Sequence, residues 1–460
     1  MTFAALDSDL TGPLFATEAM RACFSDTARL RAMLAAEAAL ARAEAELGLA
    51  PAGLAEAIAA IAPESLDAAA IGRQTAQAGV PTIPFVKAVQ SRLPPDLERA
   101  FHKGATTQDI LDTALVLQLR EALSLVAADL LAILDGLSAL AETHRGTPCV
   151  GRTYGQQAAP LTFGFKVAVW LAGVAESAER FPELRARVLV ASLGGPVGTL
   201  AGLGAHGPAV LERFAKALGL GATPIAWHAR RGRIAEAGCW LAQLIGALAK
   251  IATDIAALAA TEVGEAAEPY LPGRGGSSAM PHKRNPVSCT VILAAHAAAP
   301  GHAAALLSSM AAAHERPAGL WHAEWHALPT LFGLASGALR EARTLAEGLE
   351  VDPARMRRNL DATNGLLFAD AAAARLGAKL GREAAHALVE RAAGEVRRSG
   401  TPLRAVLEAD PAVSASCVDL AAAFDLAPAV AAAGPWLDRA VRDAARVRGL
   451  LRPESPAGPA

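Results

Sequence analysis

The strongest constraint on the fold of this 460-residue chain is a set of long segments with helical periodicity. Residues 109–143 repeat apolar side chains at three- and four-residue spacing without a proline, and residues 233–265 show the same period. Residues 286–313 continue the pattern, with a kink expected at Pro300-Gly301, and residues 161–190 are a fourth helical candidate. A helix of about 33 residues is roughly 50 Å long. Several such segments predict an elongated helical bundle.

Shorter helical segments flank these long ones. Proline interrupts residues 1–108 repeatedly, and the periodic segments shorten again from residue 351. Alanine is abundant and aromatic residues make up 4% of the chain, which favours closely packed helices over sheets. We therefore expect an all-α protein of three helical domains with a central long-helix bundle. The expected domains are residues 1–108, 109–350 and 351–450, followed by a disordered tail at 451–460.

The charge pattern gives no reason to expect a nucleic-acid or membrane partner. Lysine and arginine number 43 against 45 acidic residues, so no strong field of either sign results. The apolar run near residue 130 carries Asp129 and Asp135, which argues against a membrane span. The N-terminus lacks the basic start of a signal peptide, and the five cysteines form no CxxC pair. A cytoplasmic protein with reduced thiols is expected.

The densest polar chemistry lies in GRGGSSAMPHKRNPV, residues 273–287, which we interpret as a mobile catalytic loop at residues 273–286. Asn285 and Pro286 predict the start of a long helix, whose N-terminal end favours anions. Lys283 adds a full positive charge there. Ser277 could ionise only beside such charge and in a closed site that excludes water. The alternative is an ordinary flexible linker between helices.

Two further segments carry candidate site residues. FHKGATTQDILDT, residues 101–113, places Thr106 and Thr107 before a long helix, and His102 could move protons near neutral pH. The alternative is a helix N-cap beside a surface histidine. GRTYGQQAAPLTFG, residues 151–164, offers Thr153 and Gln156 on a loop.

Two segments match the motifs of metal and dinucleotide sites only in part. His322 and His326 have the i, i+4 spacing of zinc ligands, but the sequence is HAEWH rather than HExxH and offers no third ligand. The GxGxxG at residues 202–207 follows no predicted strand, so a dinucleotide site is a poor interpretation. We expect neither a metal nor a cofactor.

These segments together resemble the fumarase/aspartase superfamily, over residues 10 to 445. GSSAMPHKRNP is similar to its signature loop, HKGATTQDILDT to its first region and GRTYGQQAAPLTFG to its second. The resemblance implies a homotetramer built on a five-helix bundle, with each active site shared by three subunits. It also implies cofactor-independent chemistry on a small polycarboxylate, through a carbanion stabilised by its carboxylate.

The resemblance also implies roles for individual residues. Ser277 corresponds to the catalytic base, and the residues implied to hold substrate carboxylates are Lys283, Asn285, Thr106, Thr107, Thr153 and Gln156. Arg231 and Arg316 are further cations suited to a polycarboxylate, and His102 is a second candidate proton donor. Tyr154 stands where many members have a histidine, and a phenol has a much higher ordinary pKa than imidazole.

That departure separates the branches of the superfamily. Bacterial cycloisomerases, which add a carboxylate to a double bond within one molecule, also lack this histidine. Two segments of this chain, PIAWHARRGRIAE and HERPAGLWHAEWHALP, are similar to the corresponding segments of those cycloisomerases. An adenylosuccinate lyase-like enzyme that cleaves a C–N bond is the alternative of the same fold. A non-catalytic helical scaffold is the alternative from another functional class.

Overall fold

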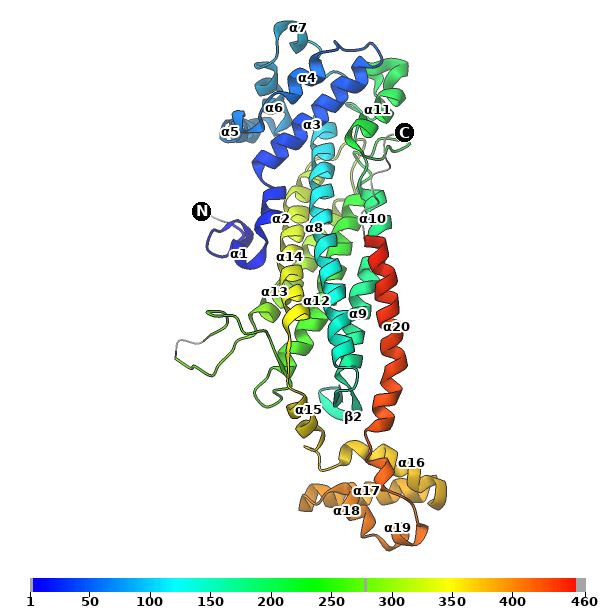
Figure 1. Ribbon diagram of the computed structural model, residues 1–460. Helices are drawn as coiled ribbons and strands as arrows, with labels where there is room; N and C mark the ends of the chain where they lie inside the picture. Colours follow the sequence, from blue (N-terminus) through cyan, green and yellow to red (C-terminus); the bar gives the residue numbers. More distant parts are fainter. Residues whose placement is uncertain (1–2, 277–278, 452–460) are drawn as a thin grey trace.

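The computed structural model describes residues 3–276 and 279–451 and has the elongated helical architecture that the periodicity predicts (Figure 1). The long helices of the bundle are α8 (Thr107–Thr143), α9 (Phe163–Glu179), α12 (Gly232–Leu258), α13 (Val287–Ser308) and α14 (Leu320–Gly348). Helix α12 packs against α13, and both pack against α14. The prediction of an all-α fold around a long-helix bundle is confirmed.

Local sequence explains where these helices begin and end. The segment expected as one helix at 161–190 divides into α9 and α10 (Phe181–Val188), with Pro182 in the first turn of α10, where proline is tolerated. Helix α13 includes Pro300 in its interior rather than ending there.

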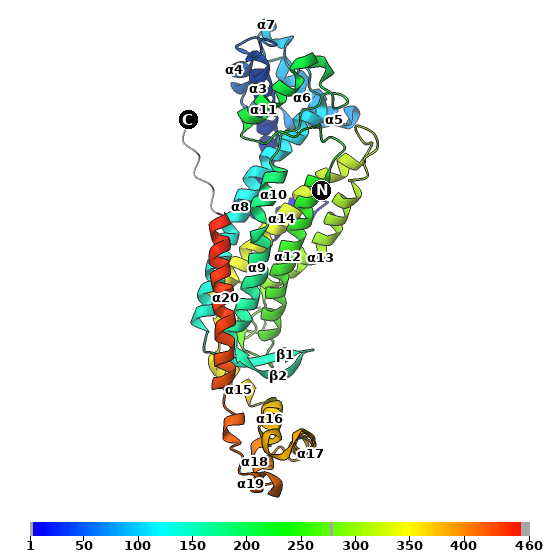
Figure 2. The same ribbon diagram turned by 90° about the vertical axis from the view of Figure 1, so that its right-hand side faces the viewer.

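The N-terminal helices lie along the side of the bundle and over one of its ends. They are η1 (Ala5–Asp7), α1 (Gly12–Phe15), α2 (Glu18–Cys23), α3 (Asp26–Ala45), α4 (Leu54–Ala59), η2 (Pro63–Ser65), α5 (Ala68–Ala78), α6 (Thr82–Gln90) and α7 (Pro95–Glu98). Helix α3 also packs against α11 (Gly207–Leu218), which follows η3 (Ala201–His206). The N-terminal cap of the bundle therefore includes a segment from the middle of the chain (Figure 2).

The C-terminal region, predicted as a domain at 351–450, packs in separate parts. A core of their own is shared by α16 (Ala369–Leu380), α17 (Arg382–Ser399), α18 (Leu403–Glu408), α19 (Pro411–Ser416) and η5 (Ala421–Ala423). Before them, α15 (Pro353–Leu360) and η4 (Leu366–Phe368) form a small cluster with Val150, and Met356 of α15 joins the main core. Helix α20 (Ala427–Leu451) instead returns along α9 and α8 (Figure 1). It buries Leu437, Ala444, Val447 and Leu451, one helical stripe, in the main core.

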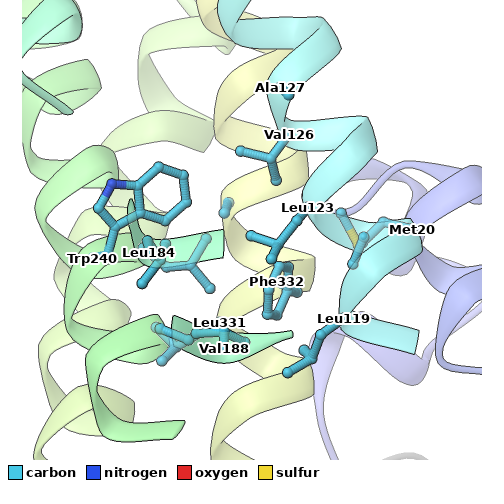
Figure 3. Packing of buried hydrophobic residues seen from close by; sticks show 14 of the residues in the cluster. Met20, Leu119, Leu123, Val126, Ala127, Leu184, Val188, Trp240, Leu331 and Phe332 are labelled. Atoms are coloured by element: carbon cyan, nitrogen blue, oxygen red, sulfur yellow. The ribbon is translucent and has the colours of Figure 1, made fainter. Parts of the chain in front are cut away.

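One hydrophobic core runs through the bundle and the N-terminal cap. In Figure 3, Leu119 and Leu123 of α8 lie near Phe332 of α14, with Trp240 of α12 farther across the interior. Trp240 is buried and donates its indole N–H to the Ser177 carbonyl at 2.9 Å, so its polar atom is satisfied. This continuous core fixes the ends of the helices that carry the candidate site residues.

A β-hairpin occupies the segment expected to be a loop. Strands β1 (Pro148–Thr153) and β2 (Gln156–Thr162) pair antiparallel, with Thr153 opposite Gln156. Tyr154 and Gly155 form the two-residue turn with φ of 52° and 75°, the left-handed pair that suits the twist of a hairpin. A second pair joins β3 (Ala266–Ala267) to β4 (Glu350–Val351). The sequence-based expectation missed the hairpin because Gln156 to Thr162 shows no clear alternation.

Three bundle helices are long and apolar enough to cross a membrane by length and composition: α8, α12 and α13. This finding differs from the expectation drawn from Asp129 and Asp135, because residues 287–308 of α13 contain no Asp, Glu, Lys or Arg. Within a single chain, the most apolar 18-residue window is 39% buried in α8, 50% buried in α12 and 33% buried in α13. Helix α13 keeps an apolar face that this chain alone does not cover, with Leu307, Ala294 and Ala298 exposed. The exposed positions of α8 and α12 are mostly polar or small, such as Asp135 and Lys250.

Candidate active site

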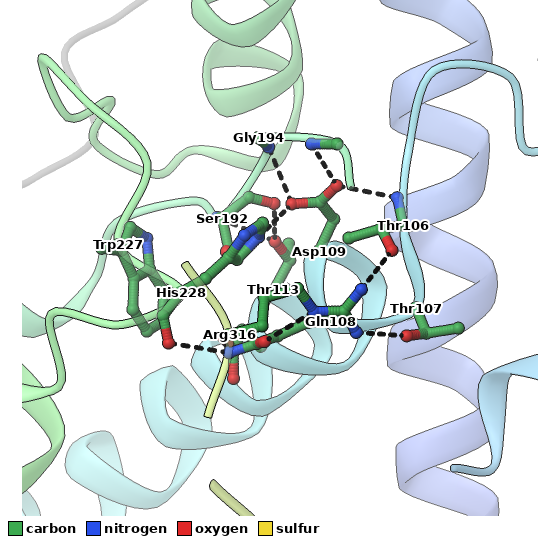
Figure 4. A network of polar contacts seen from close by, with 12 residues as sticks. Thr106, Thr107, Gln108, Asp109, Thr113, Ser192, Gly194, Trp227, His228 and Arg316 are labelled. Atoms are coloured by element: carbon green, nitrogen blue, oxygen red, sulfur yellow. Dashed lines mark hydrogen bonds and ion pairs between the residues drawn. The ribbon is translucent and has the colours of Figure 1, made fainter. Parts of the chain in front are cut away.

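The first group of predicted residues meets at the N-terminus of α8 (Figure 4). Thr106 is the N-cap residue, and the guanidinium of Arg316 donates to the hydroxyls of Thr106 and Thr107, both at 2.8 Å. A third contact joins Arg316 Nε to Gln108 Oε1 at 3.3 Å. Because a guanidinium has five N–H donors, two remain for a ligand. Three of the predicted residues thus form a cationic, hydroxyl-rich surface at a helix N-terminus, which suits a carboxylate.

Asp109 supports this surface from beneath. Its carboxylate accepts the backbone N–H of Thr106 at 2.9 Å, of Gly194 at 2.7 Å and of Gly195 at 2.9 Å. It also contacts Nε2 of the buried His228 at 2.6 Å (Figure 4). Four donors around one buried carboxylate fix the start of α8 and the glycine loop together. His228 lies within PIAWHARRGR but is not one of the predicted site residues.

His102 lies just before the threonines and has a buried partner. Its Nδ1 is 2.6 Å from Oε1 of Glu37 on α3, and its φ is 58°. Burial by itself lowers the pKa of His102, but the charge and hydrogen bond of Glu37 outweigh burial and raise that pKa above its ordinary value. Nothing in the sequence pointed to Glu37, because the α3 segment is otherwise an unbroken helical pattern.

The second group lies at the tip of the β-hairpin. Thr153 and Gln156 are exposed, and the Tyr154 side chain between them is fully exposed in this chain. The hairpin is tied to the bundle by Arg152, which makes two hydrogen bonds to the buried carboxylate of Glu265 at 2.9 and 2.6 Å. These bonds therefore hold the tip of the hairpin in a fixed position relative to the bundle.

The third group is the loop at 273–286, and the predicted catalytic Ser277 lies outside the described residues. Lys283 and Asn285 line a cavity of about 760 Å³ together with Tyr270. Arg284 anchors the loop through Glu350, at 2.8 Å, and the ion pair lowers the pKa of that carboxyl. The two predicted residues of this loop that the structure describes, Lys283 and Asn285, thus share one cavity.

The structure corrects the expected start of α13. Asn285 does not cap this helix; its N–H donates to the Gly275 carbonyl at 2.8 Å. The side chain of Glu268 accepts the N–H groups of Ser288 at 3.0 Å and Cys289 at 2.8 Å. A carboxylate of the chain itself therefore occupies the anion-binding end of this helix.

The structure also places Arg231 away from any open surface. It is 1% exposed and makes ion pairs with the buried Asp112, at 2.7 Å, and Glu324, at 2.5 Å. Its guanidinium also stacks over Trp227 at 4.8 Å. With its charge balanced by two carboxylates, Arg231 has a structural role here, in contrast to the predicted contact with substrate.

The histidine pair of HAEWH does not form a metal centre in this structure. His322 Nε2 contacts the carbonyl of Gly79 at 3.1 Å, and its ring packs against Trp325. Within residues 3–276 and 279–451, no group of three or more His, Cys, Asp or Glu side chains has a metal-binding arrangement.

The three groups do not meet within one chain. Thr106 and Arg316 lie at one end of α8 and α14, and α8 then runs for 37 residues, about 55 Å, before the hairpin begins. The loop is anchored at Glu350, beyond the far end of the 29-residue α14, about 43 Å from its start. The predicted site residues therefore occupy opposite ends of the bundle.

The fold and these groups define a helical lyase. Residues 15–301 match the family model described as Lyase, and residues 365–440 match the one described as Adenylosuccinate lyase C-terminus. The chain belongs to this lyase family, and its structural neighbours share the fumarase/aspartase fold.

Particular members of the family are similar along nearly their whole length. A 3-carboxy-cis,cis-muconate cycloisomerase of Pseudomonas putida is 46% identical over 414 residues, which is 89% of this chain and 98% of that protein. The crystal structure of the 3-carboxy-cis,cis-muconate lactonizing enzyme from Pseudomonas putida has a TM-score of 0.92 at 45% identity, covering 96% of this chain and all of that one. A nitrosuccinate lyase of Streptomyces davaonensis is 43% identical, covering 95% of each protein.

Proposed function

We propose that this chain is a cycloisomerase that converts 3-carboxy-cis,cis-muconate into 4-carboxymuconolactone. The observation that carries the proposal is the 46% identity to the Pseudomonas putida cycloisomerase across nearly both whole chains. Arg316, Thr106 and Thr107 in the N-terminal group also suit a substrate with several carboxylates. The reaction belongs to the catabolism of protocatechuate by the β-ketoadipate route.

The chemistry is an intramolecular addition. A carboxylate oxygen of the substrate forms a C–O bond to one alkene carbon, and the π electrons move to the neighbouring carbon. That carbanion is delocalised into its own carboxylate, giving an aci-carboxylate, and a proton then completes the C–H bond. The lactone is an isomer of the substrate in its acid form, so the anionic substrate takes up one proton and nothing else. Holding the attacking carboxylate against the alkene is an orientation task that can lower the barrier by several kcal/mol.

Each group of residues has a task in this reaction. Arg316, Thr106 and Thr107 hold one carboxylate, and Lys283 stabilises the charge that develops on the carbanion. Thr153, Gln156 and Asn285 contribute further hydrogen bonds. Ser277 and His102 are the two candidates for the acid–base group.

The site is completed by assembly into a homotetramer, with each active site drawn from three subunits. Two observations support this part of the proposal. The groups lie at opposite ends of a bundle about 55 Å long, and α13 leaves an apolar face with Leu307 uncovered in one chain. Subunits packed antiparallel through this face would bring one end of a bundle beside the other end of its neighbour. A cytoplasmic location is part of the same proposal.

The test is the loss of muconate ultraviolet absorbance when purified protein meets 3-carboxy-cis,cis-muconate. Adenylosuccinate and nitrosuccinate are assayed in parallel, because members of the same family act on C–N bonds. Rapid loss with the muconate alone supports the proposal, and turnover of either succinate alone refutes it. Ser277→Ala separates an enzyme from a scaffold, because an enzyme loses turnover while its melting temperature stays unchanged.

A further inference from the structure

Glu37 is a buried carboxylate that contacts His102. It lies on α3 with 1% of its surface exposed, and Oε1 is 2.6 Å from His102 Nδ1. Its Oε2 is buried without a hydrogen-bond partner, and no lysine or arginine forms an ion pair with it within the described part of the chain. An uncompensated buried carboxylate is costly, so His102 is the group that offsets its charge.

His102 is held with its other nitrogen available. Its φ of 58° lies in the left-handed region, which non-glycine residues adopt rarely and mostly where the surroundings impose it. The side chain keeps 18% of its surface exposed. Among residues 3–276 and 279–451 its one polar side-chain contact is the bond from Nδ1 to Glu37. A carboxylate that fixes one imidazole nitrogen leaves the other, Nε2, oriented for a ligand.

This pair lies beside the carboxylate-binding surface. His102 precedes the N-cap residue Thr106 by four residues, and Thr106 accepts from Arg316. We propose that Glu37 is a positioning residue that holds His102 as the proton donor of the cycloisomerisation, with Nε2–H directed to the reacting carbon. This inference rests on the proposed function and selects His102 rather than Ser277 for the protonation step.

The step balances without a further reactant. The substrate oxygen forms the C–O bond, and the π pair becomes the carbanion stabilised by its carboxylate. His102 Nε2 then releases its proton to that carbon, whose electron pair forms the C–H bond. The neutral imidazole regains a proton from water, and Glu37 keeps its contact with Nδ1. Such positioned proton transfer contributes about 10²- to 10⁴-fold in rate.

The charges around His102 favour the protonated form. Glu37 and Glu44 face it from α3 and Asp109 from α8, and Lys103 follows it in the chain. Burial lowers the pKa of His102, but these carboxylates, with Glu37 foremost, raise it overall. Turnover that needs the imidazolium is therefore present below this raised pKa and is lost as pH rises through it.

The first experiment compares Glu37→Gln with Glu44→Gln, a second buried glutamate on the same helix. Glu37→Gln is expected to lower kcat about tenfold or more on the alkaline side of the pH profile, with KM changed less than about threefold, and to move the alkaline fall of kcat to lower pH. Glu44→Gln removes only the smallest of the contributions that raise the His102 pKa, so its kcat should stay within about twofold of the wild type. His102→Asn should lose 10²- to 10⁴-fold, with no further loss in Glu37→Gln/His102→Asn. A Glu37→Gln enzyme with the wild-type kcat and pH profile overturns the proposal.

A second experiment does not depend on the substrate. Diethylpyrocarbonate modifies neutral imidazole, so its rate at His102, read by peptide mass spectrometry across pH, reports the pKa of that residue. Glu37→Gln should make His102 react at lower pH than in the wild type. An unchanged profile refutes the pairing even if the wild type acts on another substrate. A shifted profile in a protein without muconate turnover instead refutes the proposed function and leaves the pairing standing.

Discussion

Replacing Arg231 by methionine tests whether this arginine is structural. The guanidinium makes two hydrogen bonds to Asp112, at 2.7 and 3.0 Å, and two to Glu324, at 2.8 and 2.5 Å. Without it, Asp112 keeps donors from Gln108 and Trp321, but Glu324 loses both of its hydrogen bonds. Burial already raises the pKa of Glu324.

Breaking a buried pair by removing one partner costs about 3 to 5 kcal/mol. At about 2 to 4 °C per kcal/mol, the melting temperature should fall by roughly 10 °C. Arg233→Met is the matched control, because Arg233 stacks on the same Trp227 but bonds a backbone carbonyl. Its expected cost is about 1 kcal/mol.

The assay is differential scanning fluorimetry at fixed protein concentration, with kinetics on the same samples. Arg231→Met/Glu324→Leu should recover part of the lost stability, because the orphaned carboxylate is removed as well. An unchanged melting temperature with a strongly raised KM would refute this reasoning and support the predicted contact between Arg231 and the substrate.

Three further predictions concern other parts of the chain. Gly337→Ala should lower the melting temperature by several degrees, because its Cβ would lie 2.1 Å from the Phe15 carbonyl oxygen, while Gly173→Ala, with open space around it, should be neutral or stabilising by up to about 1 kcal/mol. Burial raises the pKa of Glu44 to about 8, so folding loses stability as pH rises from about 5 to 8; the advantage of Glu44→Gln in melting temperature should grow over that range and vanish below it. Iodoacetamide should label the exposed Cys417 first, while Cys149, whose buried thiol has a pKa raised to about 12, stays unlabelled in the folded protein; equal labelling of both contradicts this.

Helical periodicity predicted the bundle because long apolar repeats leave few alternatives. It could not predict that α20 joins the bundle, because the stripe from Leu437 to Leu451 fits any apolar surface and its partner is chosen by the fold. The hairpin was missed for a local reason, since its register depends on the left-handed turn at Tyr154 and Gly155.

The site was predictable where residues adjoin in sequence and not where they meet across helices. Thr106 and Thr107 were recognisable as a pair before a helix, and the structure adds Arg316, more than two hundred residues later, as their partner. The partners of His102 and Arg231 could not be anticipated, because Glu37, Asp112 and Glu324 sit in ordinary helical patterns. Charge alone therefore could not separate a substrate-binding arginine from a buried structural one.

We propose that the reaction occurs in a homotetramer, in sites formed where opposite ends of neighbouring chains meet. Arg316→Met removes the cation at one end, and Lys283→Met removes the one at the other. Each variant alone should be nearly inactive on 3-carboxy-cis,cis-muconate. Tetramers reassembled from an equal mixture should regain about a quarter of wild-type activity, because about one site in four receives two intact ends. A matched mixture of Lys283→Met with Asn285→Ala, both on one loop, should regain none. Failure of the first mixture to regain activity, in tetramers shown to be mixed, would contradict the account.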